Sequence, residues 1–184
     1  MKRFLVIFTI SFFSLCFIGI VLFGLISFVK EYETPKIYEA LVNEYCCKYE
    51  VDVNFAYAVI KAESNFNEKC VSKKGAEGLM QIMPATSKYI AIKLGEDIEN
   101  IDLFDVETNL RYGIWYISYL SEIFDDDRML IAAAYNAGEG NVRAWLKEYS
   151  EDGFSIEEIP FPETKGYVEK VLKYFEMYRS KYNY

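Results

Sequence analysis

The chain contains no histidine among its 184 residues. This absence excludes Ser-His-Asp and Cys-His mechanisms and His-ligated metal sites, and it leaves carboxylates, lysines, tyrosines and cysteines to do chemistry. Glu63 is the carboxylate best placed for a reaction, because in VIKAESNFN it closes an apolar helical run and is followed by residues that end helices. The negative end of the helix macrodipole disfavours a charged glutamate there and should raise its pKa. Glu63 is thus either a proton donor for glycosidic bond cleavage or one of the many solvated glutamates at helix ends.

The composition is that of a folded protein with a separate N-terminal segment. Hydrophobic residues make up 52% of the chain and charged residues 26%, a balance that disordered proteins do not have. Residues 4–29 contain no charge over 26 positions, which exceeds the 7 to 15 of a signal-peptide apolar core and is long enough to span a bilayer. We expect an uncleaved transmembrane anchor at 4–29, with a cleaved signal as the alternative. A linker at 30–36 then leads to one domain at 37–184.

The charge pattern separates the two parts of the chain. All 28 acidic residues and 17 of the 20 basic residues follow residue 30, a net charge of −11. Such a charge argues against nucleic acid as a partner. The basic residues that flank the anchor are balanced and leave its orientation open: Lys2 and Arg3 on one side, Lys30 and Lys36 on the other.

Three cysteines lie outside the anchor, at Cys46, Cys47 and Cys70. One of the adjacent pair could form a disulfide with Cys70, and three free thiols are the alternative. Three cysteines without histidine make a poor zinc site. We therefore expect neither a metal nor a cofactor.

The spacing of apolar residues and the cap residues predict an all-α domain. Aspartates at 52, 105 and 127 precede helical runs as N-caps, and Gly95 follows one as a helix end. A short hairpin between Lys69 and Gly78 would be easy to overlook. The expected helices are 37–49, 53–64, 84 to Gly95, 105 to about 124, 127 to about 138, 141–149 and 163 to about 182.

Four motifs follow one another along the chain: AESNFN, GAEGLMQIMP, AAAYNAGEGNV and PETKGYV. Their order and spacing resemble the lytic transglycosylase catalytic domain of the soluble lytic transglycosylase type, which shares the goose-type lysozyme fold. The resemblance covers about residues 37–181. It implies a helical, lysozyme-like domain with a cleft for peptidoglycan glycan strands.

The resemblance also implies a role for individual residues. Glu63 matches the family's catalytic acid, and Tyr135 and Asn136 match the pair that faces this acid. Met83, three positions after Met80, could equally belong to the core. The full set of positions matched to substrate-binding residues is Ser64, Ser72, Gln81, Met83, Tyr135, Asn136, Glu163 and Tyr167.

A single acid is sufficient if the substrate supplies the remaining groups. Retaining and inverting glycosidases use two carboxylates, about 5 to 5.5 Å or about 6.5 to 9.5 Å apart, and no second carboxylate here matches a partner of Glu63. Glu163 matches only a supporting group. We therefore expect cleavage of the MurNAc-GlcNAc β-1,4 bond in which Glu63 is first general acid and then general base. The acetamido oxygen stabilises the anomeric carbon and the sugar's own 6-hydroxyl attacks it, which forms a 1,6-anhydroMurNAc end.

Two other functions remain open at this point. A goose-type lysozyme-like hydrolase would use the same fold with water as the attacking group. A non-cleaving peptidoglycan-binding module could serve a secretion, conjugation or division apparatus. Because peptidoglycan lies outside the bacterial cytoplasmic membrane, we expect residues 1–3 in the cytoplasm and the domain on the outer side. The sequence indicates no particular protein partner.

Overall fold

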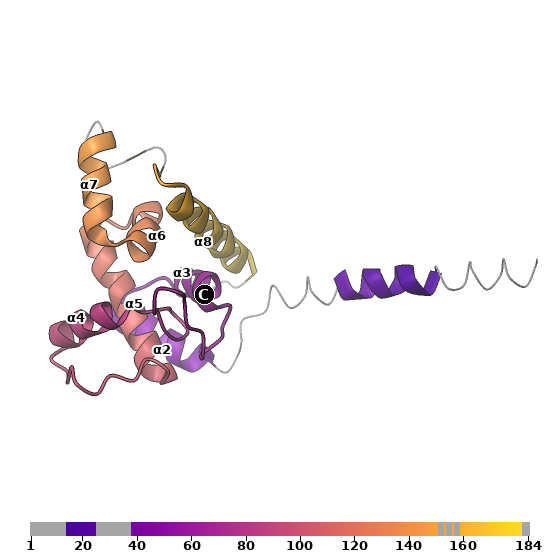
Figure 1. The fold of residues 1–184 in the computed structure, drawn as a ribbon, viewed down its shortest axis with the longest axis horizontal. Helices are drawn as coiled ribbons and strands as arrows, with labels where there is room; N and C mark the ends of the chain where they lie inside the picture. Colours follow the sequence, from indigo (N-terminus) through magenta and orange to yellow (C-terminus); the bar gives the residue numbers. More distant parts are fainter. Residues whose placement is uncertain (1–13, 25–37, 151–152, 154–155, 157–158, 182–184) are drawn as a thin grey trace, which may run out of the picture. The chain divides into compact units, whose positions relative to one another are not determined.

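The computed structural model describes residues 14–24, 38–150, 153, 156 and 159–181 (Figure 1). Contacts between Cα atoms divide the chain into two units, Met1–Thr34 and Pro35–Tyr184. In the first unit residues 14–24 are helical, with exposed side chains. No helix among the described residues combines the length and the apolar character needed to cross a membrane. The expected anchor at 4–29 lies largely outside the described residues and stays a prediction.

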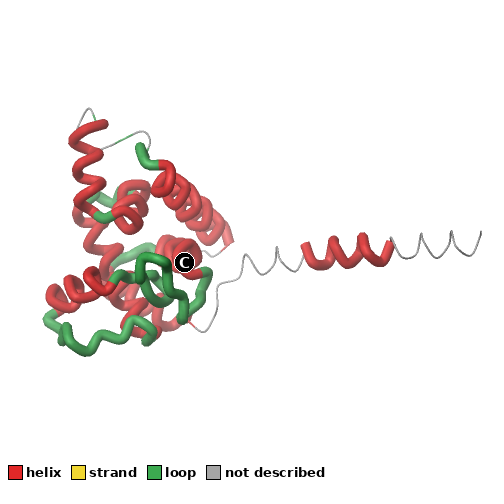
Figure 2. The backbone as a smooth tube through the Cα atoms, viewed as in Figure 1, coloured by secondary structure: helices red, strands yellow, loops and turns green. Residues whose placement is uncertain are grey.

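The described part of the second unit is helical, as the sequence predicts (Figure 2). Pairing of β type within it is limited to two isolated bridges, Val71 with Glu77 and Glu77 with Ile82, in the segment where a short hairpin was considered. The prediction of a mainly helical class is therefore confirmed. The helices are α2 Glu39–Tyr49, α3 Val53–Ser64, α4 Pro84–Leu94, α5 Val106–Ile123, α6 Arg128–Ala137, α7 Glu139–Tyr149 and α8 Pro162–Lys181.

Three aspartates cap helices as predicted. The Asp52 carboxylate accepts a hydrogen bond from Asn54 N at 2.9 Å, and Asp105 and Asp127 cap α5 and α6 in the same way. Two helix starts differ from the prediction by two residues: α7 begins at Glu139 and not at Asn141, and α2 begins at Glu39 and not at residue 37. Gly138 ends α6 at φ 89° and α7 starts directly after it, so no separate loop is needed between the two helices.

Helix α3 is the central element of the domain. Its residues are buried from Asn54 to Ala62, and it packs most extensively against α8 and also contacts α2 (Figure 1). Aromatic contacts join the two helices: the Phe55 and Phe175 ring centroids are 5.9 Å apart, and those of Tyr57 and Tyr178 are 5.8 Å apart. Burial of each such side chain stabilises the fold by about 1.5 to 3 kcal/mol. This packing fixes the end of α3, where Glu63 stands.

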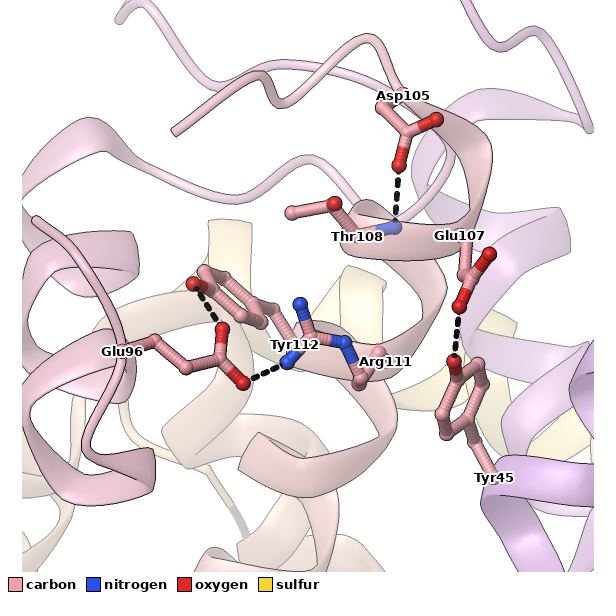
Figure 3. Close-up of polar contacts among 7 residues, drawn as sticks. All are labelled: Tyr45, Glu96, Asp105, Glu107, Thr108, Arg111 and Tyr112. Atoms are coloured by element: carbon pink, nitrogen blue, oxygen red, sulfur yellow. Dashed lines mark hydrogen bonds and ion pairs between the residues drawn. The ribbon is translucent and has the colours of Figure 1, made fainter. Parts of the chain in front are cut away.

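Polar contacts fix the position of α5 (Figure 3). The Tyr45 hydroxyl of α2 donates to Glu107 Oε1 at 2.8 Å, and the Tyr112 hydroxyl donates to Glu96 Oε2 at 2.9 Å. Arg111 forms an ion pair with the other oxygen of Glu96. Burial and these carboxylate acceptors raise the pKa of both tyrosines to about 12. The tyrosines therefore remain protonated donors that hold α5 against α2 and against the segment after α4.

The three cysteines of the second unit are free thiols. Cys46 is buried, Cys47 is exposed and Cys70 is half-buried, so the free-thiol alternative is confirmed over a disulfide to Cys70. Burial raises the pKa of the Cys46 thiol to about 12. Because the thiolate is the reactive form, this cysteine contributes packing and no chemistry at neutral pH.

Candidate active site

Glu63 lies in the last turn of α3 and is held from α8. The Tyr167 hydroxyl donates to Glu63 Oε1 at 2.7 Å. Helix α3 ends at this point because Asn65 adopts the left-handed conformation at φ 51° and its N–H bonds back to Lys61 O. The end of a buried helix therefore presents one half-buried carboxylate to a tyrosine on a neighbouring helix.

The environment of Glu63 raises its pKa to about 7. Burial is the largest cause, and the Tyr167 hydrogen bond and the charge of Lys170 act in the opposite direction. The direction is the one the sequence predicts, but burial has replaced the helix macrodipole as the leading cause. Near neutral pH the carboxyl is populated in both forms, so it can donate a proton and take one back.

Three side chains influence Glu63 or the residue before it. Tyr135 and Tyr167 were predicted as site residues from the motifs, and Lys170 was not. Burial and the charge of Glu63 raise the pKa of Tyr135 and of Tyr167 well above its ordinary value of 10, so both stay protonated. Lys170 Nζ donates to the carbonyl oxygen of Ala62, the residue before the acid. The sequence contained a signal for it, because Lys170 follows Tyr167 by three residues and so lies on the same face of α8.

Ser72 and Gln81 hold the loop between α3 and α4. Ser72 Oγ accepts hydrogen bonds from Ala76 N at 2.9 Å and Lys74 N at 3.3 Å. Gln81 Nε2 donates to Gly78 O at 2.9 Å and to Cys70 O at 3.0 Å. Both residues therefore shape the loop beside the site, whatever contacts they also make with a ligand.

Asn109 of α5 fixes the same loop, and the sequence reasoning did not find it. Its amide Nδ2 donates to Glu77 O at 2.9 Å and Leu103 O at 2.8 Å, and its Oδ1 accepts from Met80 N at 2.8 Å. A Cβ on Gly78, at φ 77°, would lie 2.7 Å from Asn109 Cγ, so only glycine allows this approach. The available signal was a polar residue within an amphipathic helix, and in the structure Asn109 is only 1% exposed.

A cavity of about 240 Å³ lies where α4, α5 and the α6–α7 junction meet. The Tyr135 hydroxyl donates to Met80 O at 2.9 Å and so joins this cavity's wall to the loop. Met83 is 38% exposed and lines the cavity, whereas Met80 is buried, so the core alternative for Met83 is not what the structure shows. The lining residues are Gln81, Ile82, Met83, Thr86, Tyr116, Tyr135, Asn136, Ala137 and Gly138.

Four of the predicted binding residues are not among those that line the cavity: Ser64, Ser72, Glu163 and Tyr167. Ser64 is buried and its Oγ donates to Ile60 O of its own helix at 3.3 Å, so its hydroxyl faces the interior. Glu163 is exposed at the start of α8 and pairs with Lys74 of the loop at 3.3 Å. Glu163 thus joins α8 to the Ser72 loop, on the face of the helix that also carries Tyr167.

Comparison with known proteins agrees with this arrangement. The chain is 39% identical over 150 residues to the soluble lytic murein transglycosylase of Escherichia coli K12. The aligned region covers 79% of this chain and 23% of that protein. It is 32% identical to membrane-bound lytic murein transglycosylase D of the same organism, over 66% of this chain and 27% of that protein. The chain therefore spans about a quarter of the length of these relatives.

Solved structures with the same fold are transglycosylases as well. An inactive mutant of lytic transglycosylase Slt from Pseudomonas aeruginosa superposes with a TM-score of 0.72 at 36% identity, over 81% of this chain and 25% of that one. The 70 kDa soluble lytic transglycosylase of Escherichia coli gives a TM-score of 0.70 at 38% identity, over 78% of this chain and 24% of that one. The family described as the transglycosylase SLT domain matches residues 40–157. With the acid at the end of a buried helix and its tyrosines in place, this chain belongs to the transglycosylase SLT domain family.

Proposed function

We propose that the domain cleaves the MurNAc-GlcNAc β-1,4 bond of peptidoglycan as a lytic transglycosylase, with Glu63 as the single acid and base. The observation that carries the proposal is the half-buried Glu63 carboxyl at the end of α3, which accepts the Tyr167 hydrogen bond at 2.7 Å and whose burial raises its pKa to about 7. Burial shifts this pKa most, and the Tyr167 hydroxyl and the Lys170 charge act against it; no carboxylate is among these causes. A glycosidase with a carboxylate nucleophile or base would instead need a second carboxylate that acts together with the first.

The reaction uses the Glu63 carboxyl group twice, first as a proton donor and then as a proton acceptor. In the first step Glu63 gives its proton to the bridging oxygen, the glycosidic bond breaks, and the acetamido oxygen of MurNAc stabilises the positive anomeric carbon. In the second step the 6-hydroxyl oxygen bonds to that carbon and its proton goes to the Glu63 carboxylate. The product is a 1,6-anhydro ring, and the enzyme returns to its protonated form without consuming water.

The neighbours of Glu63 suit both steps. The Tyr167 hydrogen bond stabilises the carboxylate formed after proton donation, and Lys170 adds a positive charge nearby. Burial acts against the carboxylate and keeps it basic enough to recover the proton. The balance gives a pKa near the working pH, where a group that must act as both acid and base is most effective.

Product analysis tests the proposal and separates it from its two alternatives. Purified protein is incubated with peptidoglycan sacculi, and the released fragments are weighed by mass spectrometry. A transglycosylase releases fragments with anhydro ends, each lighter by one water than the hydrolase product. A non-cleaving binding module retains sacculi and releases nothing.

A substitution at the acid makes the same experiment specific. Glu63→Gln keeps the shape of the side chain and removes its proton, so it should abolish release of fragments. Glu122→Gln changes an exposed carboxylate on α5 and is the matched control, which should release fragments at the wild-type rate. Appreciable release by Glu63→Gln would refute the assignment.

We also propose that residues 4–29 anchor the chain in a bacterial cytoplasmic membrane, with the domain outside. The support is the uncharged 26-residue sequence and a substrate that lies outside that membrane. Relatives carry both soluble and membrane-bound names. Cell fractionation, with protease added to intact spheroplasts, tests this: the domain should stay with the membranes and be digested from outside.

A further inference from the structure

The end of α3 that carries Glu63 is held by a side chain of another helix. The last four carbonyl groups of an α-helix have no partner within the helix. In α3 the Lys61 carbonyl accepts a hydrogen bond from Asn65 N. The Ala62 carbonyl accepts one from the Lys170 ammonium of α8. Lys170 therefore satisfies the carbonyl group of the residue directly before the acid.

Helix α8 reaches this end of α3 through two side chains on one face. The Tyr167 hydroxyl donates to Glu63 Oε1 at 2.7 Å, and Lys170 follows Tyr167 by three residues, which places it on the same face. A lysine ammonium is a point charge on a flexible stem with three N–H donors. The hydrogen bond to the Ala62 carbonyl uses one donor and keeps the charge beside the acid.

The fixed ammonium opposes two effects that disfavour the Glu63 carboxylate. Burial is the first effect, and it raises the pKa of Glu63 to about 7. The negative end of the α3 macrodipole is the second effect, and a cation on the last carbonyl groups of a helix offsets it. The charge of Lys170 lowers the pKa of Glu63, and among the described side chains it is the one cation that acts on this pKa.

The other titratable groups that face Glu63 are tyrosines, Tyr167 from α8 and Tyr135 from α6. Burial and the charge of Glu63 raise the pKa of each tyrosine well above 10. Neither tyrosine therefore brings a charge to the site at neutral pH. The positive charge that acts on the acid comes from Lys170.

We propose that Lys170 is a positioning residue of the reaction, whose ammonium, held by the Ala62 carbonyl, favours the step in which Glu63 gives up its proton. The inference rests on the proposed function and assigns Lys170 to one of its two steps. A fixed positive charge stabilises the carboxylate that forms as the glycosidic bond breaks, so it speeds this step. The same charge makes the carboxylate a weaker base, so the second step gains nothing from it. Lys170 lies outside the four motifs by which the family resemblance was recognised.

The pH profile of kcat/KM tests the inference on the full-length protein, with peptide-free GlcNAc-MurNAc oligomers of eight sugars as the substrate. Lys170→Met removes the charge and keeps the apolar stem, and Lys170→Gln removes the charge and keeps an N–H donor. In both variants the pKa of Glu63 should rise, so the alkaline limb should move up by roughly half a pH unit to one unit. A weaker acid also donates its proton more slowly, so kcat at pH 6 should fall roughly threefold to tenfold.

A conservative variant and a matched control separate the charge from the packing of the side chain. Lys170→Arg keeps the charge and should restore both the limb and kcat to within about twofold of wild type. Lys173→Met removes an exposed lysine from the next turn of α8, whose charge is not among those that act on Glu63, and its profile should match wild type. KM should stay within about twofold in all four variants, because Lys170 acts through Glu63 and not through the ligand.

Three results would overturn the inference. The first is an unchanged profile in Lys170→Met and Lys170→Gln. The second is an equal loss at every pH with an unmoved limb, because lost packing alone gives that pattern. The third is a Lys170→Arg protein that behaves like Lys170→Met. Failure of the wild-type protein to release anhydro-ended fragments from sacculi would instead refute the proposed function, so the two failures are distinguishable.

Discussion

Replacement of the acid by its amide should stabilise the protein at high pH while it abolishes cleavage. Glu63 has an ordinary pKa of 4.5 in the unfolded chain and a pKa of about 7 when folded. A carboxyl with a raised folded pKa binds protons more tightly in the native state, so the protein loses stability as pH rises from 4.5 to 7. Glu63→Gln carries no ionisable group there and escapes this loss.

The magnitude follows from the two pKa values. A difference of one in pKa corresponds to about 1.4 kcal/mol, so full ionisation costs the folded state roughly 3 kcal/mol above pH 7. At pH 5.5, where the folded carboxyl is still protonated and the unfolded one is mostly ionised, the same linkage amounts to roughly 1 kcal/mol. The gain of Glu63→Gln over wild type should therefore grow by roughly 2 kcal/mol between pH 5.5 and pH 8.

Urea unfolding at pH 5.5, 6.5 and 8 measures this difference, above the isoelectric point of about 4.8 where solubility is lowest. Glutamine still accepts the Tyr167 hydrogen bond, so the substitution isolates the charge. Glu122→Gln removes an exposed carboxylate and should show no such pH-dependent gain. A stability difference for Glu63→Gln that is the same at all three pH values would show that the carboxyl is not shifted, and the mechanism would lose its basis.

Three further substitutions test the positions of the supporting residues. Tyr167→Phe removes the hydrogen bond that favours ionised Glu63, so the alkaline limb of the kcat/KM profile should move up by about one pH unit, and an unmoved limb would contradict this coupling. Asn109→Ala removes the hydrogen-bond partner of Met80 N and Leu103 O and should cost about 3 kcal/mol in urea unfolding, whereas a loss below about 1 kcal/mol would mean that the loop is held otherwise. Gly113→Ala puts a Cβ 2.7 Å from Met80 Cβ and should lower the free energy of unfolding by about 1 to 3 kcal/mol, with unchanged stability speaking against so close a contact between α5 and Met80.

Local signals in the sequence were sufficient for the elements and for the acid. The N-cap aspartates accept hydrogen bonds from backbone N–H groups two or three residues away, and Gly95 ends its helix through its own backbone conformation. Helix bounds therefore follow from these residues directly. The predicted start of α7 is two residues too late. Gly138 ends α6 and also caps α7, so no loop residues separate the two helices and mark the boundary in the sequence. The position of Glu63 at a helix end and the sign of its pKa shift also followed from local pattern.

Contacts between distant segments decided the remainder of the site. Tyr167 meets Glu63 across 104 positions, and Asn109 meets Met80 across 29, distances in sequence over which no local rule operates. Ser64 shows the reverse case, since a motif assigned it to the cleft and the packing of α3 turned it inward. Composition and periodicity therefore determined that this chain is helical and carries one acid at a helix end. Only the tertiary structure decided how deeply that acid is buried and which groups surround it, because desolvation and hydrogen bonding depend on segments that the fold brings together.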